Sequence, residues 1–391
     1  MTHRTKVAIV GAGPAGLMLS HVLHQAGIES IVLDDRSRAD IEATIRAGIL
    51  EQGTVELLTE TGASDRVLSV GHRHDGIELQ WEGASHRIDF QALVGRSVWL
   101  YPQHEVLKDL IARRLADRGD LRFEHSVQEV TDADDPVVRG VDADGTPFEI
   151  TADFVIGADG SRSVTRTPVV GSQTGGYFRE YPFAWFGILA EAPPSSKELI
   201  YANSANGFAL ISQRSDTVQR MYLQCDPLFD PESMSEAEIW DALQSRVAGT
   251  ELKRGPIFQR DVLRFRSFVA HQLQRGHVFL IGDAAHTVPP TGAKGANLAL
   301  HDVRILGEAL RRHFANDDES LLARYEEFAL RRIWRAQHFS WWMTQMLHVA
   351  DDATDFDRRR QLGELESVAA STAAQTYLAD AYTGWPEEEL P

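Results

Sequence analysis

The residues best suited to bind a phosphate group are the glycines of Gly11-Ala12-Gly13-Pro14-Ala15-Gly16, which fit the pattern G-x-G-x-x-G. They follow the apolar run Val7–Val10 and precede residues with the apolar spacing of a helix. Glycines at such a junction permit a tight turn and let a pyrophosphate approach the helix N-terminus. Asp34 ends the next apolar run, where a carboxylate can accept hydrogen bonds from a ribose. These positions predict a dinucleotide site, although the pattern alone does not separate FAD from NAD; its expected members are Gly11, Gly13, Ala15, Gly16 and Asp34.

Two later segments combine glycine with aspartate in a similar way. Gly157-Ala158-Asp159-Gly160 and Gly282-Asp283-Ala284-Ala285-His286 each follow a short apolar run typical of a buried strand. The second segment leads through Pro289-Pro290-Thr291-Gly292 into a stretch with helical spacing. Asp283 could be a turn or N-cap residue, or it could bind a cofactor hydroxyl. His286 has no partner at a useful spacing, and we assign it a structural role.

The order of the apolar runs predicts how these segments are positioned. Val7–Val10, the helix after it and Ile31–Leu33 form a βαβ unit, which implies a parallel sheet with a right-handed crossover. The runs before Gly157 and Gly282 would rejoin this sheet, so its domain is expected to be discontinuous. Alternating patterns predict a mainly antiparallel second region in 77–96 and 198–226, with a hairpin turn in 201–207. Helix formers dominate 298–310, 321–346 and 358–381.

We therefore expect a fold of class α/β plus α+β, with a Rossmann-like nucleotide-binding domain, a mixed-sheet substrate domain and C-terminal helices. The expected boundaries are 1–73, 98–177 and 268–296 for the nucleotide-binding domain, 74–97 and 178–267 for the substrate domain, and 297–391 for the helical region.

The charge and the cysteine content exclude several other classes of protein. The chain has 39 Lys and Arg against 57 Asp and Glu, and a net charge of -18 repels nucleic acid. Cys225 is the only cysteine, which excludes an intrachain disulfide and a cysteine-rich metal site, and we expect no bound metal. A strand-like run follows the first residues directly, and no apolar stretch reaches the length of about 20 residues that spans a membrane. We expect a cytoplasmic protein without a signal peptide or membrane anchor.

Beyond these motifs, longer runs resemble the flavoprotein aromatic hydroxylases (class A flavoprotein monooxygenases), and among them the enzymes that act on 4-hydroxybenzoate. The resemblance covers essentially the whole chain, and such runs are far more specific than a short glycine motif. They are Arg46–Gly53, Tyr181–Phe183, Glu198–Asn203, Gly207–Leu210, Ser212–Ser215, Pro289–Gly295, Arg331–Trp334 and Phe339–Thr344.

The resemblance implies a glutathione-reductase-like flavoprotein fold that binds FAD, with NADH or NADPH as electron donor and O2 as the second substrate. The implied reaction converts 4-hydroxybenzoate to 3,4-dihydroxybenzoate through a C4a-hydroperoxyflavin, in a homodimer. Three alternatives remain open. The same chemistry could act on 3,4-dihydroxybenzoate or an aminobenzoate, the protein could be a non-catalytic flavoprotein that binds aromatic acids, or it could be an NAD-dependent dehydrogenase that uses only the first glycine motif.

The resemblance also assigns roles around the substrate. Arg214, with Ser212 and Tyr222, would pair with the carboxylate, because an arginine fork can bind both oxygens at once. Tyr201, Tyr382 and His74 would carry the phenol proton to solvent, and the backbone carbonyl of Pro290 would face the substrate hydroxyl. Taken alone, each would more often be a surface arginine, a packing tyrosine or a loop histidine. The remaining expected pocket residues are Thr291, Trp185, Leu199 and Leu210.

The remaining implied roles concern FAD and the electron donor. Asp283 would bind the ribityl chain of FAD, and Arg220 would hold the isoalloxazine ring. The other cofactor-binding positions are Arg46, Gln103, Asp159, Gly295 and Asn297. The donor would contact Asp35, Arg36, Arg38, Arg162 and Arg266. Acidic residues stand here where NADPH-preferring relatives carry an Arg and a Tyr, and a carboxylate repels a 2′-phosphate, so we expect NADH to be at least as good a donor as NADPH.

Overall fold

The first sheet carries the predicted nucleotide-binding turns. The structure is a computed structural model that describes residues 2–44, 48–131, 133–387 and 389–391, so Arg46 lies outside the described residues. The sheet has the order β17-β18-β11-β1-β2-β8, with β10 paired to β11 and β9 to β10. The strands are β1 (Thr2–Val10), β2 (Ser30–Leu33), β8 (Asp120–Arg122), β9 (Ser126–Thr131), β10 (Val137–Val141), β11 (Pro147–Gly157), β17 (Gln274–Arg275) and β18 (Val278–Leu280).

The predicted return of the chain to this sheet is confirmed. β11 lies parallel to β1, with Val10 opposite Gly157, and β18 lies parallel to β11. The carboxyl ends of β1, β11 and β18 therefore meet at one edge, which is where ligands bind in open α/β sheets. The helices and short turns of this part are α1 (Pro14–Gln25), α2 (Arg38–Ala43), α3 (Gln52–Glu60), α4 (Arg66–Val70), α6 (Gln103–Ala116), η1 (Gly160–Arg162), α7 (Arg166–Val170) and η2 (Gly282–Ala284).

The second large sheet has the order β19-β16-β12-β15-β14-β13-β5-β6. Its pairs are antiparallel except β13 with β5, which are parallel, so the expectation of a mainly antiparallel region is confirmed with one exception. Ser204 pairs with Gly207 at the predicted hairpin. The strands are β5 (Gly76–Trp81), β6 (Ala84–Asp89), β12 (Gly176–Ala190), β13 (Leu199–Ser204), β14 (Gly207–Gln213), β15 (Gln219–Cys225), β16 (Ile257–Ala270) and β19 (His286–Thr287), and a small third sheet contains β3 (Ile49–Glu51), β4 (His72–His74) and β7 (Val98–Leu100).

The two faces of the second sheet form different cores. Side chains alternate along a strand, so Ile200, Ile211 and Met221 point to one side, where they pack with Trp240 of α8 (Glu236–Gln244). The opposite face belongs to the main core and is strongly aromatic. It carries Trp185, Leu199, Tyr201, Phe208, Leu210 and Tyr222. Every one of these side chains except that of Phe208 is a predicted pocket residue.

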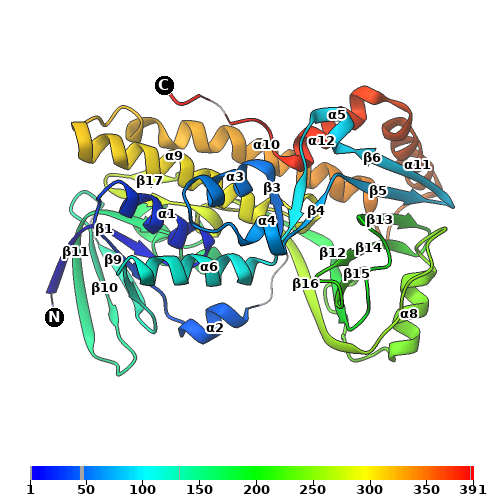
Figure 1. The fold of residues 1–391 in the computed structure, drawn as a ribbon, viewed down its shortest axis with the longest axis horizontal. Helices are drawn as coiled ribbons and strands as arrows, with labels where there is room; N and C mark the ends of the chain where they lie inside the picture. Colours follow the sequence, from blue (N-terminus) through cyan, green and yellow to red (C-terminus); the bar gives the residue numbers. More distant parts are fainter. Residues whose placement is uncertain (1, 45–47, 132, 388) are drawn as a thin grey trace.

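The C-terminal helices connect the two large sheets. Figure 1 shows α9 (Gly295–Asn316) and α10 (Tyr325–Leu347) running along the first sheet towards the second, with α11 (Asp355–Ala370) and α12 (Thr372–Thr383) beyond them. The helix formers expected over 358–381 are in helices, but in two of them, because the chain breaks at Ser371. This residue has extended backbone angles, and its hydroxyl accepts a hydrogen bond from the backbone N–H of Ala374. Ser371 is therefore the N-cap of a new helix, which begins at Thr372. The shorter elements are α5 (Phe90–Val94), η3 (Pro290–Gly292) and η4 (Leu322–Arg324).

The division of the chain into three domains stays a prediction. β12 begins at Gly176 and β16 ends at Ala270, so both strands run past the boundaries expected at 177/178 and 267/268. In the described part of the chain, no helix is long and apolar enough to cross a lipid bilayer.

Candidate active site

The glycine turn after β1 is packed directly against the turn after β11. Gly11 has a φ of 111°, and a Cβ atom there would lie 2.2 Å from the carbonyl oxygen of Ala158. A Cβ at Gly16 would lie 2.0 Å from the carbonyl oxygen of Gly11. Gly13, in contrast, faces open space, with no atom within 4 Å of a Cβ built there. The turn is thus closed towards the protein and open on the side where a pyrophosphate would approach.

Asp34 already accepts hydrogen bonds on both carboxylate oxygens. Oδ2 accepts the backbone N–H of Ala12 at 2.7 Å and Nη2 of Arg36 at 3.0 Å, while Oδ1 accepts the backbone N–H and Nε of Arg36. These four bonds use the acceptor capacity of a carboxylate. The predicted contact of Asp34 with a ribose therefore requires the half-exposed Arg36 side chain to move away first.

The two aspartates of the later glycine turns differ. Asp159 accepts the backbone N–H groups of Val164 and Thr165 and the Thr165 hydroxyl, so it fixes its own turn. The Asp283 carboxylate is half-buried and has no hydrogen-bond partner in the described part of the chain, which leaves it able to accept from a ligand. The structural role assigned to His286 is supported by a partner that sequence spacing did not reveal: its Nε2 lies 2.7 Å from the buried Asp302, which also accepts the backbone N–H of Gly282.

The start of α9 faces the segment that leads into α3. The amide of Asn297 donates to the carbonyl oxygens of Ile49 and Ala293 and accepts the backbone N–H of Glu51 at 2.9 Å. Gly295 begins the helix and a Cβ there would touch nothing within 4 Å, so the first turn is open to a ligand. Gln103 is half-buried in the first turn of α6.

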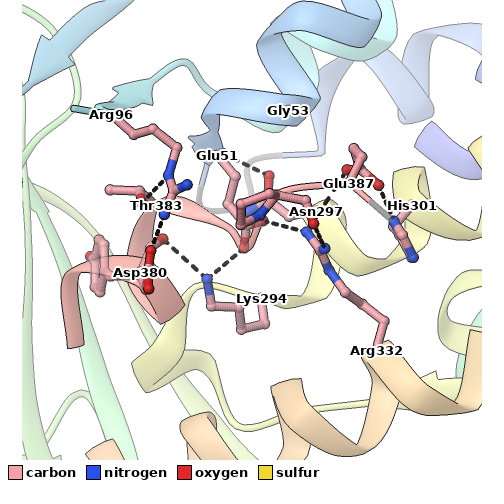
Figure 2. Close-up of polar contacts among 12 residues, drawn as sticks. Glu51, Gly53, Arg96, Lys294, Asn297, His301, Arg332, Asp380, Thr383 and Glu387 are labelled. Carbon is pink, nitrogen blue, oxygen red and sulfur yellow. Dashed lines mark hydrogen bonds and ion pairs between the residues drawn. The ribbon is translucent and has the colours of Figure 1, made fainter. Parts of the chain in front are cut away.

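A buried lysine, which the sequence did not single out, lies beside these residues. Figure 2 shows Lys294 between Glu51 and the end of α12, with Nζ 2.5 Å from Glu51 Oε1 and 3.1 Å from the carbonyl oxygen of Tyr382. Burial lowers the pKa of Lys294, and the neighbouring Glu51 opposes this shift. A lone lysine between glycines gives no sequence signal that its partner is a glutamate more than two hundred residues earlier.

The C-terminal residues extend the same group of charges. Glu387 lies 2.9 Å from His301 and 3.8 Å from Arg332, which in turn lies 3.8 Å from Glu51 (Figure 2). Burial would raise the pKa of Glu387, but His301 and the nearby arginines outweigh it and hold that pKa at about 2. A cavity of about 310 Å³ next to these residues is lined by α1, α3, α9, α10 and the C-terminus, and it contains none of the predicted site residues.

The predicted substrate residues share the aromatic face of the second sheet. Tyr201, Leu210 and Tyr222 are opposite one another on β13, β14 and β15, and Ser212 is opposite Arg220. The Ser212 hydroxyl donates to the carbonyl oxygen of Arg220 at 2.7 Å. The structure therefore brings together side chains that the sequence places in three separate strands.

Two arginines are buried on this face. Burial lowers the pKa of Arg214 to about 10, and Tyr222 and Asp261 act in the opposite direction. Arg220 lies 5.0 Å from the Tyr222 ring and pairs with Asp261 at 3.0 Å. Its Nε and Nη1 atoms are buried and have no hydrogen-bond partner among the described residues. Orphaned donors of this kind fit an acceptor supplied by a ligand such as FAD.

The two tyrosines expected at the substrate phenol are in contact. Their hydroxyl oxygens are 2.6 Å apart, and the Tyr201 hydroxyl also lies 3.4 Å from the carbonyl oxygen of Thr291. Both side chains are buried, and burial is the main cause that raises the pKa of each. Both are therefore neutral phenols at pH 7, able to pass a proton along hydroxyl groups. The carbonyl oxygen of Pro290 accepts the backbone N–H of Ala293, which leaves its second lone pair for a ligand.

His74 does not reach solvent as expected. Its side chain is only 2% exposed, and neither ring nitrogen has a hydrogen-bond partner among the described residues. Burial lowers the pKa of His74 to about 4, with smaller opposing effects from Glu198 and Asp75. A proton route to solvent would have to continue past this ring. A local sequence pattern could not show this, since burial depends on how β4 packs.

The residues expected to bind the electron donor lie in two groups. Asp35, Arg36 and Arg38 follow β2, where Arg38 pairs with Glu42 at 2.6 Å. Arg162 is exposed on η1, next to Ser161, whose hydroxyl accepts a hydrogen bond from Arg266 at 2.5 Å. In the described residues no group of three or more His, Cys, Asp or Glu side chains could hold a metal ion.

Comparison with known proteins identifies the class. A family model described as an FAD binding domain matches residues 4–340. The geometry agrees with it, because the open Gly13 turn and the orphaned donors of Arg220 fit a bound flavin nucleotide. The chain belongs to this family and is an FAD-dependent aromatic hydroxylase.

Individual relatives support this class. The chain is 41% identical to the p-hydroxybenzoate hydroxylase of Acinetobacter baylyi, covering 99% of this chain and 97% of that protein. It is 30% identical to the 6-methylpretetramide 4-monooxygenase of Streptomyces rimosus, covering 79% of this chain and 76% of that protein. The crystal structure of p-nitrophenol 4-monooxygenase from Pseudomonas putida superposes with a TM-score of 0.80 over 99% of this chain and 100% of that one, at 20% identity, which supports the fold alone.

We expect Gly11→Ala to abolish stable FAD binding. The added Cβ meets the Ala158 carbonyl in a left-handed backbone conformation, so the turn must open, at a cost of about 1–3 kcal/mol of stability. The measurement is flavin absorbance per chain in the purified variant. Gly363→Ala in α11, where a Cβ meets nothing within 4 Å, is the control and should keep full flavin content. A yellow Gly11→Ala protein with normal stability would contradict the packing described here.

We expect His74 to make stability fall between pH 6.5 and about 4. The unfolded chain binds a proton at His74 in this range and the folded protein does not, so stability is present above the unfolded pKa and decreases as the pH falls. One such proton gives a slope of at most about 1.4 kcal/mol per pH unit. The free energy of unfolding is measured by urea unfolding of wild type and His74→Gln between pH 4 and pH 7.5. It should decrease less steeply with falling pH in the variant than in the wild type, and the values at pH 7.5 are the reference for each protein. Equal slopes would mean that His74 is accessible to protons in the folded state.

Proposed function

We propose that this hydroxylase acts on 4-hydroxybenzoate, adding oxygen at C3 to give 3,4-dihydroxybenzoate with consumption of O2 and NADH or NADPH. The observation that carries the proposal is that a buried arginine and a buried tyrosine, which contacts a second tyrosine on α12, share one aromatic face, so that an acid and a phenol can be recognised at the same time. We further propose a homodimer that works in the cytoplasm, and its mass in solution can be tested by light scattering.

The carboxylate end of the substrate is assigned to Arg214. Burying a guanidinium is costly, as its lowered pKa indicates, and an anionic ligand offsets that cost through charge-assisted hydrogen bonds. The protein as a whole has a net charge of -18, so an anionic substrate needs such a local positive site. Ser212 and Tyr222 lie beside it on the same face. Tyr222 can donate to the carboxylate directly, whereas the Ser212 hydroxyl must first turn away from the carbonyl oxygen of Arg220.

The phenol end is assigned to Tyr201. A phenol has an ordinary pKa near 10, and its phenolate gives far more electron density to the ring carbon next to the oxygen. The hydroxyl of Tyr201 can accept the substrate proton and pass it to Tyr382, which lies 2.6 Å away. Lowering the substrate pKa by about 2 units requires about 3 kcal/mol of differential stabilisation, which a few directed hydrogen bonds in a dry pocket can provide.

The cofactor is assigned to the edge where β1, β11 and β18 end. Bound FAD supplies electron transfer from the nicotinamide and activation of O2. The glycine turn would receive its pyrophosphate, Asp283 would accept from its ribityl hydroxyls, and Arg220 would donate to the flavin ring. The aromatic side chains around Trp185 would exclude water from the substrate face of the second sheet.

The decisive experiment is stopped-flow reduction of the bound flavin by NADH with and without 4-hydroxybenzoate. We expect the substrate to accelerate reduction strongly in the wild type. Arg214→Met should lose roughly 30- to 5,000-fold in kcat/KM, since removing one partner of a buried charge pair costs about 2–5 kcal/mol. Arg254→Met removes an exposed arginine that pairs with Asp241 and serves as the control. No acceleration by 4-hydroxybenzoate, or equal effects of the two variants, would overturn the proposal.

For the donor, we propose that NADH is at least as good as NADPH. Asp35 is exposed after β2, and a carboxylate there repels a 2′-phosphate. The ratio of kcat/KM for the two donors tests this, and a ratio that strongly favours NADPH would contradict it.

A further inference from the structure

A histidine that the proposed mechanism does not use is buried beside the substrate face. His348 ends α10, and its Nε2 lies 2.7 Å from the indole Nε1 of Trp185. Its Nδ1 lies 2.9 Å from the carbonyl oxygen of Thr344. An indole nitrogen can only donate and a carbonyl can only accept, so Nδ1 carries the proton and Nε2 accepts from Trp185.

The surroundings keep this ring neutral. Aromatic rings pack around His348, with centroids 4.6 Å away for Phe183, 4.4 Å for Phe208 and 5.5 Å for Phe265. Burial lowers its pKa to about 3. A protonated ring would point an N–H at the indole N–H and lose the bond to Trp185. Burial therefore favours the neutral ring, which keeps Nε2 as the acceptor for Trp185.

Trp185 connects this bond to the proposed pocket. Its ring centroid lies 4.6 Å from that of Tyr222 and 5.4 Å from that of Phe208, on the face that carries Tyr201 and Leu210. Contacts between aromatic rings have preferred geometries worth about 0.5–1.5 kcal/mol each, but they give the buried indole N–H of Trp185 no polar partner. The bond to His348 supplies that partner and so favours one orientation of the ring.

The same turn of α10 also contacts the other end of the pocket. The Thr344 hydroxyl lies 2.9 Å from that of Thr291, whose carbonyl oxygen is 3.4 Å from the Tyr201 hydroxyl. The end of the helix is fixed in turn, because Asn203 donates to the carbonyl oxygen of Leu347 and Gln361 to that of His348. His348 is thus held rigidly relative to both Trp185 and Tyr201.

We propose that His348 is a positioning residue that fixes the Trp185 ring in the wall of the substrate pocket and thereby limits which ring substituents the enzyme accepts. This inference rests on the proposed function, because it takes the aromatic face of the second sheet to be the substrate site. It concerns the ring of the substrate, whereas Arg214 and Tyr201 recognise its two polar ends.

The test compares His348→Leu with His348→Gln, alone and combined with Trp185→Phe. Leucine removes the acceptor and leaves a buried indole N–H unpaired, whereas the glutamine Oε1 can replace it. We expect the Kd of 4-hydroxybenzoate, measured by its perturbation of the flavin absorbance, to rise about 5- to 100-fold in His348→Leu and to recover in large part in His348→Gln. In His348→Leu, the effect should appear in Kd and KM more than in kcat. The ratio of kcat/KM for 4-hydroxybenzoate to that for 2,4-dihydroxybenzoate should also decrease.

Two further measurements separate positioning from a merely structural effect. In the Trp185→Phe background, His348→Leu should change Kd less than 2-fold, because the residue it positions is already gone. In protein labelled with 15N at its tryptophans, the Trp185 indole resonance, assigned through Trp185→Phe, should shift in His348→Leu and stay in His348→Gln. The indole of Trp240, which donates to the carbonyl oxygen of Gly255, is the internal control and should not move.

The outcomes distinguish the inference from the function on which it rests. If the wild type binds 4-hydroxybenzoate and His348→Leu binds it equally well, the positioning role is overturned and the proposed function stands. The positioning role is also overturned if His348→Leu weakens binding of 4-hydroxybenzoate equally in the wild-type and Trp185→Phe backgrounds. If the wild type does not bind 4-hydroxybenzoate at all, the proposed function fails, and the specificity role falls with it even when the indole resonance shifts as expected.

Discussion

The contact of two hydroxyl groups, those of Tyr201 and Tyr382, is the interaction on which the candidate site depends. A 2.6 Å approach between a strand and a helix 181 residues later in sequence requires both elements to be fixed within a few tenths of an ångström. α12 is held from several sides: Arg96 bonds to Asp380 and Lys294 donates to the carbonyl oxygen of Tyr382 (Figure 2). In addition, the Phe90 ring stacks on that of Tyr382 at 5.2 Å. The contact between the two tyrosines thus depends on long-range packing that joins three parts of the chain.

The candidate site also depends on buried cations. An acidic protein that binds FAD, and for which an anionic substrate is proposed, needs positive charge inside, where each uncompensated charge is costly. Lys294 is compensated by Glu51, and Arg220 by Asp261 through only one of its nitrogens. This difference in the partners of Lys294 and Arg220 fits the surroundings of each side chain. Lys294 anchors protein segments to one another, so its partners are internal, whereas Arg220 keeps donors available on the face where a ligand is proposed.

The sequence was most informative where the determinants are local. Glycines with a positive φ, such as Gly11, and apolar runs ending in Gly-Asp turns predicted the shared edge of β1, β11 and β18, since both the backbone conformation and the order of strands follow from neighbouring residues. The resemblance assigned pocket residues that the alternation of the strands places on one face. Pairs between distant residues, such as His286 with Asp302, leave no local pattern and could not be predicted. The break at Ser371 had a local signal, a serine N-cap, which the helix-forming residues around it concealed.

α10 explains how the proposed pocket can be accurate although it is made from several segments. Gln337 on this helix donates to the carbonyl oxygens of Phe268 and Thr287, which lie where the second sheet meets the segment that leads to α9. One turn later Ser340 packs so closely on Gly292 that a Cβ there would lie 2.7 Å from its hydroxyl oxygen. The last turn then reaches Trp185 through His348. A helix is stiff over this length, so these contacts are fixed relative to one another. Side chains positioned by a helix are also placed more accurately than side chains positioned by loops. α10 therefore fixes the relative positions of Trp185, of Thr291 beside Tyr201 and of the segment that leads to α9.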